Sequence, residues 1–325
     1  MAGSAEAMTA ARRERLAFAA TWHQLRFEEL RTLVRHAERL GYEAAYLDGD
    51  IGFVPSLGEA DVLDGWTVQT ALALATERIR LASIRLVHHW HAFRLAQAVA
   101  TFERIAPGRQ RVFVAVGGQA GDAAAGLPFP PHADRVAWLD ETLSAARRLW
   151  TEPAVSAQGR FVNLRSARVR PRPPAPPWVE IGAASEATLR VVARHADAWN
   201  LNRPAIPSEI ARLDAAFARA CDAVGRDPAT VERTLWLFAR PGDEAGDALA
   251  DYRRFTPWHR AFPDAALRAS FLTGGTDAAR ERLAGFRESL SLDLPVVDVT
   301  GLPLAAAQVA LEALAPRHES RPGAS

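Results

Sequence analysis

Cysteine is almost absent from this chain of 325 residues, and lysine is absent altogether. The single cysteine, Cys221, excludes an intramolecular disulfide and with it the class of disulfide-stapled secreted domains. It lies in a helical pattern over 210–224, where a small buried apolar role fits it best. All 39 basic residues are therefore arginine, against 38 acidic residues. The formal net charge of +1 gives no electrostatic reason to expect nucleic acid or an anionic membrane surface as a partner.

Long apolar runs are also lacking. No run approaches the roughly 18 residues that span a bilayer. The first 15 residues are small, polar and arginine-bearing, unlike a signal peptide. We therefore expect a cytoplasmic protein with flexible tails over 1–15 and 317–325. The chain is 49% hydrophobic, which is enough to bury a large core, and we expect a single domain over 16–316.

Strand-like and helix-like segments alternate along that domain. The expected strands are 16–20, 44–47, 79–87, 111–116, 178–181, 198–201, 234–239 and 295–299. The expected helices are 27–40, 65–76, 92–105, 132–150, 185–195, 207–224, 278–290 and 304–314. Residues 154–164 are typical of a small hairpin, and 241–275 is too long for an ordinary connection, so we expect a helix plus an insertion there. Eight βα units favour an α/β fold, a (β/α)8 TIM barrel, over two doubly wound domains.

The chemistry of such a barrel lies at the carboxyl ends of its strands. Residues 182–188 follow the fifth strand with Gly182, Ala183 and Ala184, and a helix then begins at Ser185, with Thr188 in its first turn. Small residues allow close approach to the backbone, and the N–H groups of a helix start attract anions. The turn is thus a candidate phosphate site, although an ordinary βα turn capped by Ser185 would look the same. Gly117 and Gly118 follow the fourth strand but lack the spacing of a dinucleotide fingerprint.

The most unusual cluster is His88, His89 and His91, which follows the third strand together with Trp90. A histidine here could act as a general acid near neutral pH, or simply pack and hydrogen-bond at the rim. We expect no metal site, because adjacent residues of an extended chain point apart and no Cys or Glu lies nearby.

For several other polar residues, both a structural and a functional role are possible interpretations. Glu180 interrupts an apolar strand, and we favour a buried pair with an arginine over a ligand contact. We expect Arg135 to pair on the surface. Asn200 ends the sixth strand, where its amide could bond a ligand. Asp50 follows the second strand and is either a turn former or a proton carrier.

Read in order, these segments resemble the bacterial-luciferase-like oxidoreductases. The residues that carry the resemblance are 111–118, 126–135, 178–182 and 197–200, and the Pro-Phe-Pro-Pro stretch at 128–131 is most similar to the branch that uses the deazaflavin coenzyme F420. The resemblance implies that the turn at 182–188 binds the cofactor phosphate and that Gly117 and Gly118 pass close to the cofactor.

Two further features follow from the resemblance alone. It implies a non-proline cis peptide bond between Ser83 and Ile84, behind the ring system. It also places a histidine after the second strand, where this chain has Asp48-Gly49-Asp50 instead. We therefore expect Asp50 or a histidine of the third strand to handle protons.

The resulting expectation is an oxidoreductase that transfers a hydride between F420 and a small organic substrate containing a C=C, C=N or C=O bond. Two alternatives are an FMNH2-dependent monooxygenase that uses O2, with FMN as cofactor, and a member of the family that only binds. The resemblance also implies a homodimer. Aromatic residues predict an apolar substrate wall and, in the insertion, either a mobile lid or an oligomer contact. They are Trp22, Phe53, Trp66 and Trp90 in the wall, and Trp258 in the 241–275 insertion.

Overall fold

The computed structural model describes residues 14–21, 25–47, 49, 62–117, 126–242 and 245–317. Eight parallel strands of this part form a closed ring, since each pairs with the next and β11 pairs with both β9 and β1. In ring order they are β1 (Ala17–Ala19), β2 (Ala44–Leu47), β3 (Arg80–Leu86), β4 (Gln110–Ala115), β7 (Trp178–Gly182), β8 (Ala198–Asn200), β9 (Glu232–Pro241) and β11 (Leu294–Asp298). The predicted TIM barrel is confirmed.

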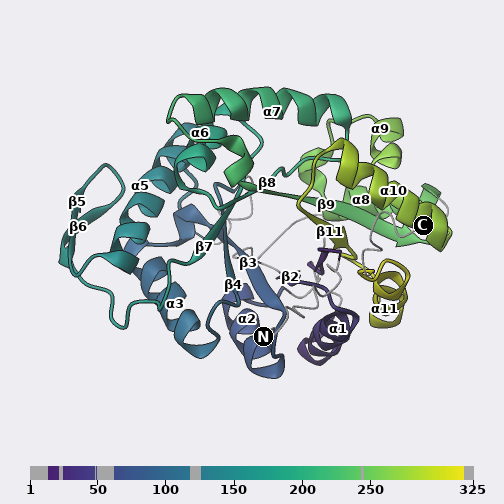
Figure 1. Cartoon of the computed structure of the whole chain (residues 1–325), viewed down its shortest axis with the longest axis horizontal. Coiled ribbons are helices and arrows are strands. Elements are labelled where there is room, and N and C mark those ends of the chain that lie inside the picture. Colours follow the sequence, from purple (N-terminus) through teal and green to yellow (C-terminus); the bar gives the residue numbers. More distant parts are fainter. Residues whose placement is uncertain are drawn as a thin grey trace, which may run out of the picture.

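Helices surround the ring on its outside (Figure 1). They are α1 (Phe27–Leu40), α2 (Gly65–Ala75), α3 (Ala92–Ile105), α5 (His132–Thr151), α6 (Glu186–His195), α7 (Pro207–Asp222), α10 (Thr276–Ser289) and α11 (Leu304–Ala313). Helix α1 illustrates the apolar spacing that predicted the helices: Leu30, Leu33 and Val34 share its buried face. It ends at Gly41, whose φ of 92° lets its N–H reach back to the carbonyl of Ala37.

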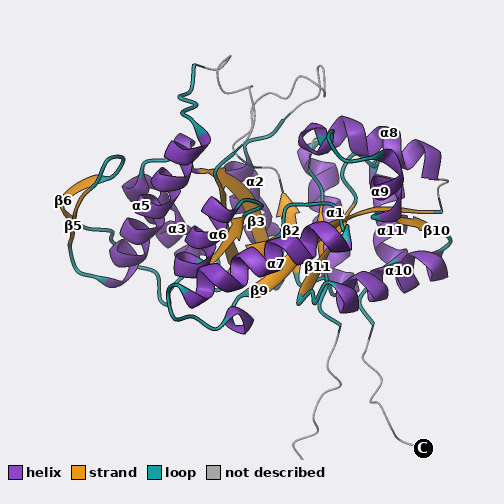
Figure 2. Ribbon diagram, turned by 90° about the horizontal axis from the view of Figure 1, so that it is seen from above, coloured by secondary structure: helices purple, strands orange, loops and turns teal. Residues whose placement is uncertain are grey.

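Two additions lie on opposite sides of the barrel (Figure 1). Strands β5 (Val155–Gln158) and β6 (Asn163–Ala167) form the expected antiparallel hairpin, which stands away from the ring (Figure 2). The 241–275 insertion contains α8 (Ala245–Phe255), the 3-10 turn η4 (Pro257–His259), α9 (Asp264–Ala269) and β10 (Leu272–Gly274). Strand β10 extends the sheet by pairing with the far end of β9, so the insertion is anchored to the barrel rather than loosely attached.

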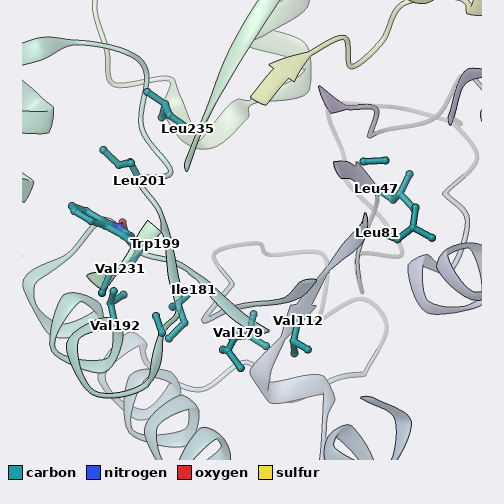
Figure 3. Packing of buried hydrophobic residues seen from close by; sticks show 14 of the residues in the cluster. Leu47, Leu81, Val112, Val179, Ile181, Val192, Trp199, Leu201, Val231 and Leu235 are labelled. Carbon is teal, nitrogen blue, oxygen red and sulfur yellow. The ribbon is translucent and has the colours of Figure 1, made fainter. Parts of the chain in front are cut away.

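The strands separate two layers of apolar side chains. Outward-facing residues pack under the helices, and Figure 3 shows part of that layer around Ile181, Val192 and Trp199. Inside the ring the side chains are mostly small, with Ala17, Ala19, Ala44 and Ala82 leaving room for a few large rings. Among the described helices none is both long and apolar enough to cross a membrane.

Buried charges close the amino end of the barrel. Arg111 and Glu180 are fully buried and lie 2.9 Å apart, which confirms the predicted pair for Glu180. Glu232 bridges Arg111 at 2.6 Å and Arg15 at 2.7 Å. The N–H of Glu14 also donates to the carbonyl of Arg317. Residues 14, 15 and 317, which the sequence placed in flexible tails, thus contact the barrel; most of both tails lies outside the described residues.

Candidate functional site at the carboxyl end of the barrel

Three aromatic rings fill the barrel just below its carboxyl end. Tyr46, Phe113 and Trp236 meet edge-on or tilted, with ring centroids 5.7 to 6.4 Å apart. Beneath them, Glu180 accepts hydrogen bonds from the hydroxyls of Tyr46 and Thr234, each at 2.6 Å. We call the three rings the aromatic floor. Because the described side chains below it pack or pair with one another, a ligand of this barrel must bind above it, where the strands end.

The turn after β7 meets this floor. A Cβ on Gly182 would come within 3.2 Å of the Phe113 ring, so glycine lets the strand end lie against the floor. Ser185 caps α6: its hydroxyl accepts from Thr188 N at 3.3 Å, and Thr188 Oγ1 accepts from Ser185 N at 3.2 Å. Within the described chain, the N–H groups of Ala184, Glu186 and Ala187 have no hydrogen-bond partner. Three donors therefore remain at the positive end of the helix.

An arginine stands beside these donors. Arg203, from the loop after β8, donates to the carbonyls of Ala184 at 3.1 Å and Asn202 at 3.2 Å. Asn202 adopts a left-handed φ of 48°, which turns the loop toward α6. The guanidinium stays charged at any physiological pH. The arrangement of helix N-terminus, small residues and arginine suits a phosphate group.

The backbone at the histidine cluster differs from the extended chain that we expected from the sequence. Residues 87–89 form a 3-10 turn, η2 (Val87–His89), and the rings of His88 and His89 lie 4.4 Å apart. The expectation that adjacent histidines on an extended chain point apart is therefore wrong, because the chain is not extended there. Within the described residues no group of three His, Cys, Asp or Glu side chains could hold a metal ion.

The three histidines have different surroundings. His88 is buried, with its ring 5.5 Å from that of Phe129. Gly117, at φ 70°, leaves room for it, since a Cβ there would lie 2.9 Å from His88 Cε1. His89 is half-buried. His91 is exposed and caps α3, its Nδ1 accepting from Phe93 N at 3.3 Å. His88 and His89 are thus better placed than His91 to face a ligand.

Arg135 has a structural role that the sequence reading missed. It is buried, its Nε donates to the carbonyl of Val116 at 2.7 Å, and its guanidinium lies 4.0 Å from the Phe129 ring. It also donates to the carbonyls of Pro130 and Gly117. The predicted surface pair is therefore wrong. Arg135 instead joins the end of β4 to the Pro-Phe-Pro-Pro segment.

The predicted cis bond between Ser83 and Ile84 is also wrong. Among the described residues only Arg170–Pro171 is cis. Strand β3 pairs without interruption through this point, with Ser83 opposite Val112 and Ile84 opposite Phe113, so it contains no bulge. Ser83 faces outward and bonds Gln69 and Arg85, whereas Ile84 packs with the residues inside the barrel. Of these two predicted cofactor contacts, only the side chain of Ile84 faces the barrel interior.

Other predicted ligand contacts are used within the protein. Asn200 donates to Thr234 Oγ1 at 3.0 Å, and its Oδ1 accepts from Asn202 N at 3.1 Å, so it joins the end of β8 to β9 and to the loop that follows β8. Trp66 and Trp90 flank the guanidinium of Arg85 and line a groove over α2 and α3, outside the ring. Trp258 lies on η4 in the insertion and is partly exposed.

Some predicted residues lie outside the described part of the chain: Trp22, Asp48, Asp50, Phe53 and Gly118. Conversely, one strand-end residue was not selected from the sequence. Asp298 is the last residue of β11 and ends the apolar run Leu294–Val297. The rule that selects strand ends, applied to the eighth strand as to the first six, would have found it.

Comparison with known proteins agrees with this architecture. A family model described as luciferase-like monooxygenase matches residues 15–293. An F420-dependent hydroxymycolic acid dehydrogenase of Mycobacterium tuberculosis is 30% identical over 171 residues, covering 52% of this chain and 47% of that protein. An FMNH(2)-dependent dimethylsulfone monooxygenase of Pseudomonas putida is 28% identical over 193 residues, covering 58% and 53%. The chain thus spans about half the length of the curated relatives it matches.

Solved structures match over nearly the whole chain. An F420-dependent secondary alcohol dehydrogenase superposes with a TM-score of 0.82 and 15% identity, covering 93% of this chain and 99% of that one. At this identity the likeness shows the fold alone. The match of the family model across most of the chain goes further, and with it the resemblance read from the sequence is confirmed: the chain belongs to the luciferase-like monooxygenase family.

Proposed function

We propose that this protein is an oxidoreductase that transfers a hydride between the deazaflavin coenzyme F420 and a small organic substrate with a C=C, C=N or C=O bond. The observation that carries the proposal is the group of unpaired N–H donors at Ala184, Glu186 and Ala187 beside Arg203. Such donors fit a phosphate, and the aromatic floor below them fits a flat ring system. The F420-dependent relative named above supports the choice of cofactor.

In this proposal each part of the site has one task. The bound cofactor supplies the hydride chemistry. The first turn of α6 and Arg203 would hold its phosphate, and the aromatic floor would lie beneath its ring. His88 and His89 lie at the end of β3, where they would exchange a proton with the bound substrate or cofactor. Arg135 holds the loop after β4 against His88 through Phe129.

Reduced FMN is the alternative cofactor, because it also carries a phosphate and a flat ring and because the Pseudomonas putida relative is named for it. Titration of the protein with F420 and with FMN, followed by fluorescence quenching, separates the two. We expect F420 to bind at least about tenfold more tightly, a difference of about 1.4 kcal/mol. Tighter binding of FMN together with oxygen-consuming turnover would favour the monooxygenase instead.

A further inference from the structure

An acidic side chain lies on the inner face of β11, directly above the aromatic floor. Leu294 and Val296 of this strand pack with the residues inside the ring, so by the two-residue period of a strand Asp298 continues the same face. Val296 pairs with Trp236 of the floor, and Asp298 pairs with Ala19 of β1 and Phe238 of β9. Asp298 is therefore the first polar side chain that this strand presents above the floor.

The carboxyl group is buried but incompletely bonded. Asp298 is 5% exposed, and its Oδ1 accepts a hydrogen bond from Thr300 N at 3.0 Å. Within the described chain, Thr300 is its only hydrogen-bond donor, through the backbone and the nearby hydroxyl. An ionised carboxylate has about four acceptor positions. The surroundings thus solvate the charged form of Asp298 poorly.

The residues around Asp298 form hydrogen bonds with Thr300 rather than with the Asp298 carboxyl group. The Thr300 hydroxyl bonds that of Thr21 at 2.9 Å, and the Thr300 carbonyl accepts from Arg240 at 2.6 Å. Arg240 also bonds Asp251 at 3.3 Å and lies over the Phe238 ring. The geometry holds the backbone of the β11 end firmly and leaves the carboxyl group to the barrel interior.

Burial raises the pKa of Asp298, and the bonds from Thr300 and the charge of Arg240 only partly oppose it. The charged and titratable groups that face it are Arg240 of β9 and Tyr252 of α8. Behind them lie Asp251, bonded to Arg240, and His259, bonded to the Tyr252 hydroxyl at 2.6 Å. An acid held this way keeps its proton to a higher pH than an exposed one and can donate it.

We propose that Asp298 is a second proton-exchanging residue of the site, acting from the β11 end on a substrate bound above the aromatic floor. This inference rests on the proposed function. When a substrate carbonyl carbon receives a hydride from the reduced deazaflavin, the electron pair of its π bond moves to oxygen. That oxygen takes the proton of the Asp298 carboxyl group, which is left as a carboxylate, while His88 or His89 accepts the proton that the cofactor gives up on oxidation. In the reverse oxidation, the carboxylate accepts the proton of the alcohol as the hydride leaves.

The test compares Asp298→Asn with Asp251→Asn. An amide at 298 keeps an oxygen to accept from Thr300 N but carries no exchangeable acid proton, whereas Asp251 contacts the same Arg240 from a half-exposed position. We expect Asp298→Asn to fold, to quench F420 fluorescence as the wild type does, and to lose turnover by about 100-fold together with one limb of the pH–rate profile. Asp251→Asn should keep turnover and the profile.

A second measurement needs no cofactor. The infrared absorption of a protonated carboxyl group, followed with pH in the free protein, should lose one component in Asp298→Asn. Unchanged turnover and pH profile in that variant would overturn the proposal, as would the absence of such a component. If the wild type binds neither F420 nor FMN, the proposed function fails, while the infrared result still decides whether Asp298 holds its proton.

Discussion

At the scale of single residues, buried polar side chains inside the barrel contribute to its stability. Glu180 receives bonds from Arg111, Tyr46 and Thr234, and all of these side chains are buried. Of the two carboxylates that form ion pairs with Arg111 among the described residues, replacing Glu180 by glutamine leaves Glu232. We expect Glu180→Gln to lower the free energy of unfolding by about 3 kcal/mol, because the buried Arg111 guanidinium then loses one of the two carboxylates that compensate its charge. Urea denaturation measures this, and an unchanged midpoint would show that the pair contributes little.

Substitutions of His88, His89 and His91 should differ in their effect on turnover. His88 and His89 lie together at the end of β3, whereas His91 caps α3 from the surface. We expect His88→Gln or His89→Gln to lower turnover by about 100-fold. His91→Asn should keep turnover, since asparagine also caps helices well. Steady-state rates with saturating cofactor decide this; equal losses in all three variants would mean that position in the cluster does not matter.

At the scale of elements, the start of α6 is the part most sensitive to charge. A carboxylate at position 184 would lie in the turn that carries the free N–H groups and next to Arg203, which bonds the Ala184 carbonyl, so its charge would repel a phosphate bound there. We expect Ala184→Asp to weaken cofactor binding at least about tenfold, a cost of about 1.4 kcal/mol, and Ala184→Asn, of the same size without the charge, to weaken it much less. Fluorescence titration compares them. Equal binding by both variants would place the phosphate elsewhere.

The insertion should respond to acid through His259. Burial, followed by the charge of Arg203, lowers the pKa of His259 to about 4 from a usual 6.5. The unfolded chain therefore binds this proton more readily than the folded one, so stability falls as pH drops from about 6.5 to about 4. We expect up to about 3 kcal/mol from this residue. His259→Gln should flatten the pH dependence of the urea midpoint over that range; an identical dependence would contradict it.

For the whole molecule, the fold was more predictable than the site. Helix bounds such as those of α1 and α3 followed from apolar spacing and from stop signals, because covered helices and buried strands impose strict patterns. The orientation of side chains was harder to predict from the sequence. That His88 lies on a 3-10 turn, or that Arg135 points inward, depends on contacts between segments far apart in the chain. Asp298 could have been found from the sequence, since it ends an apolar strand.

The central claim is that a phosphate-bearing redox cofactor is anchored at the start of α6 with its ring above the aromatic floor. A crystal structure of the protein soaked with F420 tests it most directly. The account predicts phosphate oxygens within hydrogen-bond distance of the N–H groups of Ala184, Glu186 and Ala187, and the ring above Phe113 and Trp236. A cofactor bound elsewhere, with this turn empty, would contradict it.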